Sequence, residues 1–197
     1  MRPARVQRGA FPDPAYAGAV EALTANGLGL DRGTIRLSRT TEGWLAVGSV
    51  LRDRVSQNLI PVTTRVEHMG SSSVVGLLAK PIIDLAVGAR DQDVPQIAKR
   101  LGAAGWIYRG DGGDDGGYLF VLEARHWCRI AHLHVVEVDG VQWRNYLRFR
   151  DVLRRSAVAR STYEAVKLRL AEAHGEDREA YTKGKTDVVR SILGEHE

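Results

Sequence analysis

Side chains suited to chemistry are concentrated between residues 66 and 87. One glycine and three serines in succession, Gly70 to Ser73, form a segment of small residues with hydrogen-bonding side chains. Glycine permits backbone conformations closed to other residues, so the N–H groups and hydroxyls of this segment can surround an anion such as phosphate. The sequence therefore predicts a phosphate-binding loop at Gly70 to Ser73.

A single carboxylate, Asp84, interrupts the apolar run Ile82–Val87 that follows the loop. An unpaired carboxylate in apolar surroundings is costly, so Asp84 needs a metal ion, a cation or a hydroxyl as its partner. Lys80 stands between the loop and the carboxylate and could place a positive charge on a phosphate. A phosphate-binding loop beside a metal-binding carboxylate indicates nucleotide chemistry.

Two histidines, His132 and His134, lie in the predicted strand Ile130–Val138. Side chains two positions apart on a strand point to the same face, so both imidazoles can share one ligand. Together with Asp84 they could hold a divalent ion, for which imidazole favours manganese, zinc or iron over magnesium. Contact with phosphate or substrate, or hydrogen bonding on a polar sheet face, are alternative roles.

Glu67–Val74 and Gly76–Asp84 closely resemble the signature of the GrpB-like family, a branch of the nucleotidyltransferase-fold superfamily related to DNA polymerase beta. The resemblance continues through Ala131–Val135 and Leu147–Arg154 and covers roughly residues 36 to 193. The superfamily's signature pairs two acids one residue apart on one strand. Here the second position is Ala86.

The resemblance implies metal-dependent transfer of a nucleotidyl group from a nucleoside triphosphate, expected to be ATP, to a small-molecule acceptor. A carboxylate acceptor would give an acyl-adenylate for amide-bond formation. The divalent metal would be magnesium, manganese or zinc, and a histidine or Glu67 would deprotonate the acceptor. The implied residues are, for catalysis, Asp84, Glu67, His132 and His134; for the nucleotide, Gly70, Ser71, Ser72, Lys80, Arg148 and Arg150; and for the metal, Asp84, His132 and His134. Tyr181, Lys183 and Lys185 are weaker candidates for ligand binding.

Two other functions are compatible with the sequence. A non-catalytic nucleotide- or metabolite-binding protein would explain Ala86, because two-metal catalysis needs carboxylates that bridge both ions. A metal-dependent hydrolase or oxygenase could use Asp84, His132 and His134, but it would leave the serine-rich loop without a role.

Composition limits the remaining possibilities. The 197 residues, of which 44% are hydrophobic, can bury one full core, and the net charge of +4 favours anionic ligands. The basic residues do not gather into the dense patch of a nucleic-acid-binding protein. No apolar run approaches the ~18 residues of a membrane span, and the N-terminus lacks the apolar core of a signal peptide. We expect a cytoplasmic protein without an intramolecular disulfide, because Cys128 is its one cysteine.

Alternation of strands and helices, followed by helices alone, predicts an α/β fold: a nucleotidyltransferase-type mixed β-sheet with flanking helices and a C-terminal helical section. Residues 1–35 are assigned to an N-terminal extension and residues 36–197 to the nucleotidyltransferase domain. Helices are predicted at Ala15–Asn26, Thr40–Asn58 and Val94–Gly105, and in two or three pieces from Trp143 to Leu193; strands at Pro61–Glu67, Pro81–Val87, Trp106–Arg109, Tyr118–Leu122 and Ile130–Val138; and a loop at Gly110–Gly117. Val50 is placed on the apolar side of the second helix.

Overall fold

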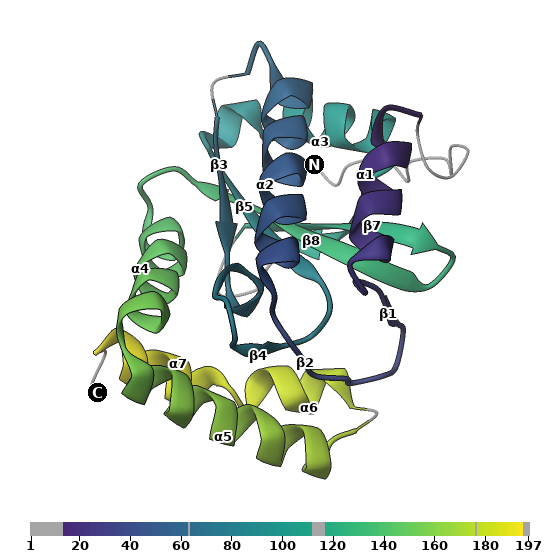
Figure 1. Ribbon diagram of the computed structural model, residues 1–197. Coiled ribbons are helices and arrows are strands. Elements are labelled where there is room, and N and C mark those ends of the chain that lie inside the picture. Colours follow the sequence, from purple (N-terminus) through teal and green to yellow (C-terminus); the bar gives the residue numbers. More distant parts are fainter. Residues whose placement is uncertain (1–13, 63, 112–116, 176, 195–197) are drawn as a thin grey trace.

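The computed structural model describes residues 14–62, 64–111, 117–175 and 177–194 (Figure 1). Its main sheet has the strand order β3-β5-β8-β7-β6, with β1 paired to β8, and the pairing is antiparallel except between β5 and β8. The strands are β1 (Leu30–Asp31), β3 (Arg65–Met69), β5 (Ile83–Ala89), β6 (Ile107–Asp111), β7 (Tyr118–Arg125) and β8 (Cys128–Glu137). A separate antiparallel pair joins β2 (Ser38–Arg39) to β4 (Leu78–Ala79).

Helices cover both faces of the sheet and extend beyond one end of it (Figure 1). On one face lie α1 (Pro14–Ala25), α2 (Glu42–Leu59) and α3 (Val94–Ala103), and on the other lies α4 (Val141–Arg155). The chain then continues into α5 (Ala157–Ala173), α6 (Arg178–Lys183) and α7 (Thr186–Leu193). Short 3-10 turns, η1 (Ser71–Ser73) and η2 (Asp91–Asp93), follow β3 and β5.

Alternation along β5 decides which residues face which layer. Leu85 and Val87 are fully buried in the main core, which they share with α1, α2 and α3. Ala86 points to the opposite face, into a smaller cluster with Met69, Val136 and Trp143 of α4. Because Asp84 lies two residues before Ala86, its carboxylate is also on the α4 side of the sheet.

The backbone of α2 passes very close to β3. Thr41 caps the helix by accepting a hydrogen bond from the N–H of Trp44 at 3.3 Å. Gly48 faces the buried His68, and an added Cβ at residue 48 would lie 2.5 Å from its ring. Val50, predicted on the apolar side, is 55% exposed. Gly48 instead takes the buried position, because the tight contact with His68 leaves no room for a side chain.

The predicted α/β architecture is confirmed, although several element boundaries differ. The strand predicted from Pro61 begins at Arg65. In the predicted loop Gly110–Gly117, Gly110 belongs to β6, whereas residues 112–116 lie outside the described residues, as do residues 1–13 at the N-terminus.

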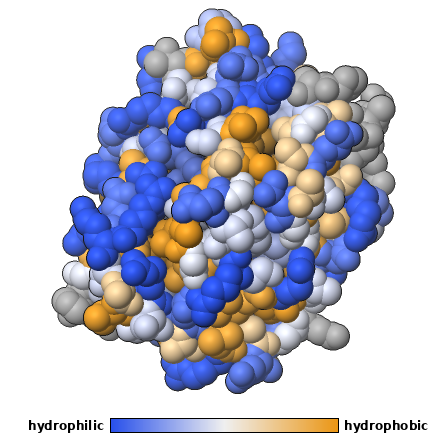
Figure 2. Space-filling model, in the orientation of Figure 1, coloured by the Kyte–Doolittle hydropathy of each residue, from blue (hydrophilic) through white to orange (hydrophobic). Residues whose placement is uncertain are grey.

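The N-terminal extension contributes to the main core. Within its described part, Tyr16 and Leu23 of α1 are fully buried, and Leu30 of β1 pairs with Arg129 of β8. Polar residues cover most of the face seen in Figure 2, and hydrophobic residues form separate patches on it. No helix in the described ranges combines the length and the apolar character that crossing a membrane requires.

The packing of Ala86 predicts the effect of restoring the second acid of the superfamily signature. Ala86→Asp would place a carboxylate among Met69, Val136 and Trp143, and we expect it to lower the free energy of unfolding by roughly 3–5 kcal/mol, the usual cost of an uncompensated buried charge. Denaturant titration at pH 7 measures this. Ala165→Asp, on the exposed side of α5, is the control. A loss below about 1 kcal/mol would show that the position accommodates the charge.

Candidate functional site

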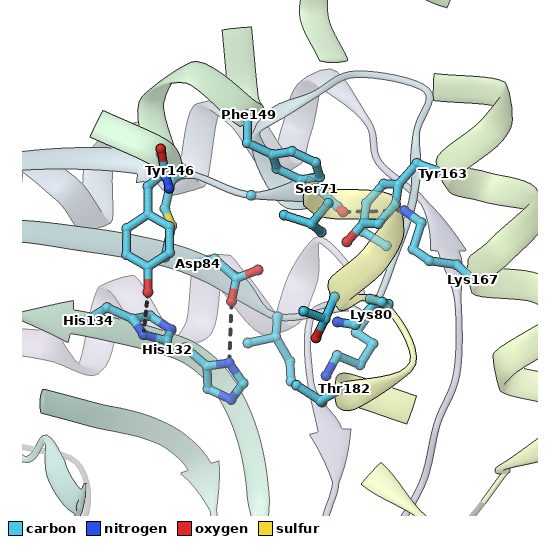
Figure 3. Close-up of a pocket in the computed structure, with 18 of the residues that line it drawn as sticks. Ser71, Lys80, Asp84, His132, His134, Tyr146, Phe149, Tyr163, Lys167 and Thr182 are labelled. Carbon is cyan, nitrogen blue, oxygen red and sulfur yellow. Dashed lines mark hydrogen bonds and ion pairs between the residues drawn. The ribbon is translucent and has the colours of Figure 1, made fainter. Parts of the chain in front are cut away.

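A cavity of about 580 Å³ lies between the sheet and the C-terminal helices. Its walls come from the loop after β3, from β5 and β8, and from α4 through α7. Figure 3 shows Asp84 near its centre, between Ser71 with Lys167 on one side and His132 on the other. Segments far apart in the sequence therefore meet around one carboxylate.

The loop passes directly over Asp84 because residue 70 is a glycine. Gly70 has a φ of 68°, and a Cβ at this position would lie 3.0 Å from Asp84 Oδ2. Gly70 and Ser71 both line the cavity. The Ser71 hydroxyl accepts a hydrogen bond from Lys167 Nζ at 3.3 Å and also bonds to Tyr163. Two of the three predicted loop residues therefore face the cavity.

Ser72 lies behind the loop and does not line the cavity. Its fully buried hydroxyl accepts the backbone N–H of Asp84 at 3.0 Å and lies 3.0 Å from His68 Nε2. The neighbouring Ser73 hydroxyl donates to the Gly70 carbonyl at 2.8 Å. The 3-10 turn directs these two side chains toward the protein, so they hold the loop against β5.

Asp84 and His132 form a carboxylate–imidazole pair, with Asp84 Oδ1 3.3 Å from His132 Nδ1. Burial alone would raise the pKa of Asp84, but the hydrogen bond to His132 and nearby positive charges hold that pKa below its ordinary value. Burial lowers the pKa of His132, and the Asp84 contact opposes this only in part. At neutral pH the pair is an ionised carboxylate and a neutral imidazole, whose buried Nε2 has no hydrogen-bond partner in the described part of the chain.

His134 faces the same side of the sheet but has a different partner. Its Nδ1 lies 3.3 Å from the Tyr146 hydroxyl, and burial lowers its pKa to about 4. Within the part of the chain that the structure describes, no three His, Cys, Asp or Glu side chains come together as metal ligands. The predicted set of Asp84, His132 and His134 is thus not preassembled. Among these three side chains, Asp84 Oδ2 is the atom placed to coordinate a metal ion. The remaining coordinating oxygens would come from a bound ligand such as a phosphate.

Positive charge dominates the cavity wall. The lysines and arginines that line it are Lys80, Arg129, Lys167, Arg178, Lys185 and Arg190, whereas Asp84 is the one Asp or Glu among the described lining residues. Burial, together with the charge of Lys185, lowers the pKa of both Lys80 and Lys167 to about 7. Lys167 is only 2% exposed and lies 4.3 Å from the centre of the Tyr163 ring. Such a wall is suited to a ligand with several negative charges.

Besides Ser72, three predicted site residues lie outside the cavity lining: Glu67, Arg148 and Arg150. Arg150 Nη1 donates to Glu67 Oε2 at 2.8 Å, and the same guanidinium also binds Asp151. These contacts join α4 to β3 and occupy both Glu67 and Arg150. Arg148 is exposed on α4. Lys183, one of the weaker candidates, is also exposed and pairs with Glu179 at 2.8 Å.

Sequence reasoning missed most of the cations that do line the cavity. Arg129, Lys167, Arg178 and Arg190 come from β8, α5, α6 and α7, so only the tertiary fold brings them together. One local signal exists for Lys167. It follows Tyr163 by four residues, on the same side of a helix as the apolar positions that pack inward.

The profile of the family described as GrpB protein matches residues 34–195. The chain belongs to the GrpB family. The resemblance detected in the loop signature is thereby confirmed, over a span that includes every residue given above as lining the cavity.

Relatives with similar sequences include the glutamate-rich protein GrpB of Alkalihalophilus pseudofirmus, which is 30% identical over 85% of this chain and 99% of its own length. A UPF0157 protein of Streptomyces coelicolor is 39% identical over 64% of this chain and 66% of its own. The crystal structure of conserved protein GrpB from Enterococcus faecalis matches with a TM-score of 0.70 at 28% identity, covering 81% of this chain and 96% of that chain. A structure of the Cid1 poly(U) polymerase gives a TM-score of 0.47 at 12% identity, over 68% of this chain and 43% of that one.

His68 behind the loop predicts a pH dependence of stability. Burial lowers its pKa from 6.5 to about 4, so the unfolded chain takes up a proton at a pH where the folded chain does not. The free energy of unfolding should therefore fall as the pH drops from 6.5 toward 4. Denaturant titrations across this range should show a smaller decline for His68→Gln than for the parent. His126→Gln, at an exposed position, is the control. Equal declines in all three proteins would contradict the assignment.

Proposed function

We propose that this protein binds a nucleoside triphosphate, with ATP as the expected nucleotide, and transfers its nucleotidyl group to a small-molecule acceptor. The observation that carries the proposal is a cavity lined by six cationic side chains and one carboxylate, closed on one side by the Gly70–Ser71 loop. Phosphoryl-type transfer depends chiefly on positioning and on electrostatic stabilisation, which such a wall supplies.

The triphosphate lies against the loop, where Lys167 and Lys185 neutralise its charge. Lys167 already donates to the Ser71 hydroxyl, so its ammonium group is positioned at the loop before a ligand binds. Lys80 and Lys185 lie 5.4 and 4.8 Å from the centre of the Tyr181 ring, which holds both amines on the same side of the cavity. The negative charge that develops on the departing pyrophosphate is thereby offset by groups that need little rearrangement.

His132 is the general base in this proposal, and Asp84 orients it. Asp84 accepts from Nδ1–H, which leaves Nε2 as the proton acceptor of a neutral ring. The acceptor's oxygen or nitrogen forms a bond to the α-phosphorus, its proton passes to His132 Nε2, and the bond to the bridging oxygen breaks to release pyrophosphate. A carboxylate acceptor is already ionised at neutral pH, so it would form the bond to the α-phosphorus and release pyrophosphate without proton transfer to His132, which yields an acyl-adenylate.

A divalent ion held by Asp84 Oδ2 and phosphate oxygens would supply additional charge neutralisation at the triphosphate. Magnesium or manganese suits an oxygen-only ligand set of this kind, whereas zinc would require His132 or His134 to reorient.

A binding protein without transfer activity is the second candidate, and the packing of Ala86 favours it. The position of the second acid is filled by an apolar cluster with Trp143 and Met69, so a second bridging carboxylate has no place there. This candidate shares the cationic cavity with the first and differs only in chemistry.

Asp84→Asn separates the two candidates. If the protein is a transferase, the variant should release pyrophosphate from ATP at least about 100-fold more slowly, because the base loses its orienting charge. The assay supplies a panel of small carboxylates, amines and alcohols as acceptors. Nucleotide affinity without divalent ions should stay the same or rise, since a negative charge leaves a cationic cavity. Asp53→Asn, at an exposed position, is the control. Nucleotide binding with no pyrophosphate release by the parent on any acceptor would favour the binding protein.

The two lysines with a pKa of about 7 predict proton uptake on nucleotide binding. At pH 8 Lys80 and Lys167 are largely neutral, and a nearby triphosphate raises the pKa of each by favouring the charged form. Calorimetric titration with ATP in buffers of different ionisation enthalpy should show net uptake, reduced in Lys167→Met. Lys99→Met, exposed on α3, should behave like the parent. The absence of uptake at pH 8 would mean that neither amine changes its charge on binding.

A further inference from the structure

Arg178 of α6 is half-buried, and its guanidinium group has no partner among the described residues. Both terminal nitrogens of its guanidinium group, Nη1 and Nη2, are buried and make no hydrogen bond, and the residue lines the cavity. A buried charge without compensation costs free energy, so such groups are normally paired in folded proteins. Burial also lowers the pKa of Arg178. The two free nitrogens form a planar fork that matches the two oxygens of a carboxylate or a phosphate.

A second guanidinium group accompanies the first. Arg129 of β8 lines the same cavity, and its pKa is lowered by burial and then by the charge of Arg178. The one carboxylate among the described lining residues, Asp84, is already paired with His132. The protein therefore brings two mutually repelling cations together in the cavity, and an anionic ligand would remove that repulsion.

Arg129 lies near both His132 and Lys80, since its charge lowers the pKa of each. The loop side is formed by Ser71 with Lys167 and Tyr163 of α5, which contact one another. Arg129 instead shares β8 with His132, whose Nε2 is likewise buried and unpartnered. In Figure 3 Asp84 lies between Ser71 and His132, so a ligand beside His132 and a triphosphate at the loop would meet at the carboxylate.

We infer that Arg178, assisted by Arg129, is a subsite for an oxyanion on the acceptor: the acceptor carries a carboxylate or phosphate group. That this oxyanion belongs to the acceptor rests on the proposed function, whereas the oxyanion subsite follows from the arginines alone. His132 Nε2 is then the free group on the same strand as Arg129, available to the part of the acceptor that reacts.

Calorimetric titration tests the subsite. The protein is first saturated with α,β-methylene-ATP, which cannot transfer its nucleotidyl group, and is then titrated with succinate and, separately, with inorganic phosphate. We expect at least one of the two anions to bind, and Arg178→Gln to weaken that binding by at least about tenfold. The affinity for the ATP analogue should fall by a clearly smaller factor in this variant, because the other cations of the wall remain. The anion that binds identifies the oxyanion as carboxylate or phosphate.

A matched variant removes the same charge elsewhere. Arg169→Gln, exposed on α5, should leave both affinities unchanged. Loss of an unpartnered buried charge should not lower the melting temperature, so Arg178→Gln is expected to fold at least as stably as the parent. If it does not fold, Arg178→Lys keeps the charge without the fork and should still weaken anion binding.

Two results would overturn the inference: no binding of either anion, or an equal loss of analogue and anion affinity in Arg178→Gln, which would place the guanidinium on the polyphosphate. Failure of the proposed function has a different signature. If the analogue does not bind, the free protein is titrated with the same anions. Anion binding that depends on Arg178 would then support the oxyanion subsite and reject the proposed function. No anion binding would reject both the subsite and the proposed function.

Discussion

The candidate site depends on one buried hydroxyl. Ser72 accepts the backbone N–H of Asp84 and contacts His68, so a single side chain ties the loop to the strand that carries the carboxylate. Without these two hydrogen bonds, nothing described here would hold Gly70 over Asp84 Oδ2. The loop would then lose its position relative to the cavity wall. The positive φ of Gly70 and the inward direction of Ser72 are thus two parts of the same constraint.

Cationic side chains that repel one another line the cavity around Asp84. Lys80, Lys167 and Arg129 are each desolvated, and each has a lowered pKa as a result. Aromatic rings compensate in part, since Tyr163 and Tyr181 lie beside amines, but they do not neutralise the charge. An anion in the cavity would offset part of the free energy that the folded chain loses by desolvating these groups. Such preorganisation favours polyanionic ligands over neutral ones.

The loop and Asp84 could be predicted because they lie within one short stretch, where residue type and order carry the information. The direction of Ser72 could not, because it is set by the 3-10 turn and by the contact with His68. Arg150 was expected at the ligand but binds Glu67, since the orientation of α4 on the sheet decides which arginines reach the cavity. Arg129 and Arg178 belong to segments about fifty residues apart, and their meeting is a property of the folded helices and sheet alone.

The close contact between Gly48 and His68 makes the far side of the sheet part of the site. The backbone of α2 packs against the His68 ring, His68 Nε2 lies within hydrogen-bond distance of the Ser72 hydroxyl, and that hydroxyl accepts the backbone N–H of Asp84. A methyl group added to a helix that touches no ligand would push on this chain of atoms and tilt the carboxylate. The geometry of the cavity therefore depends on the spacing between α2 and β3 as well as on the residues that line it.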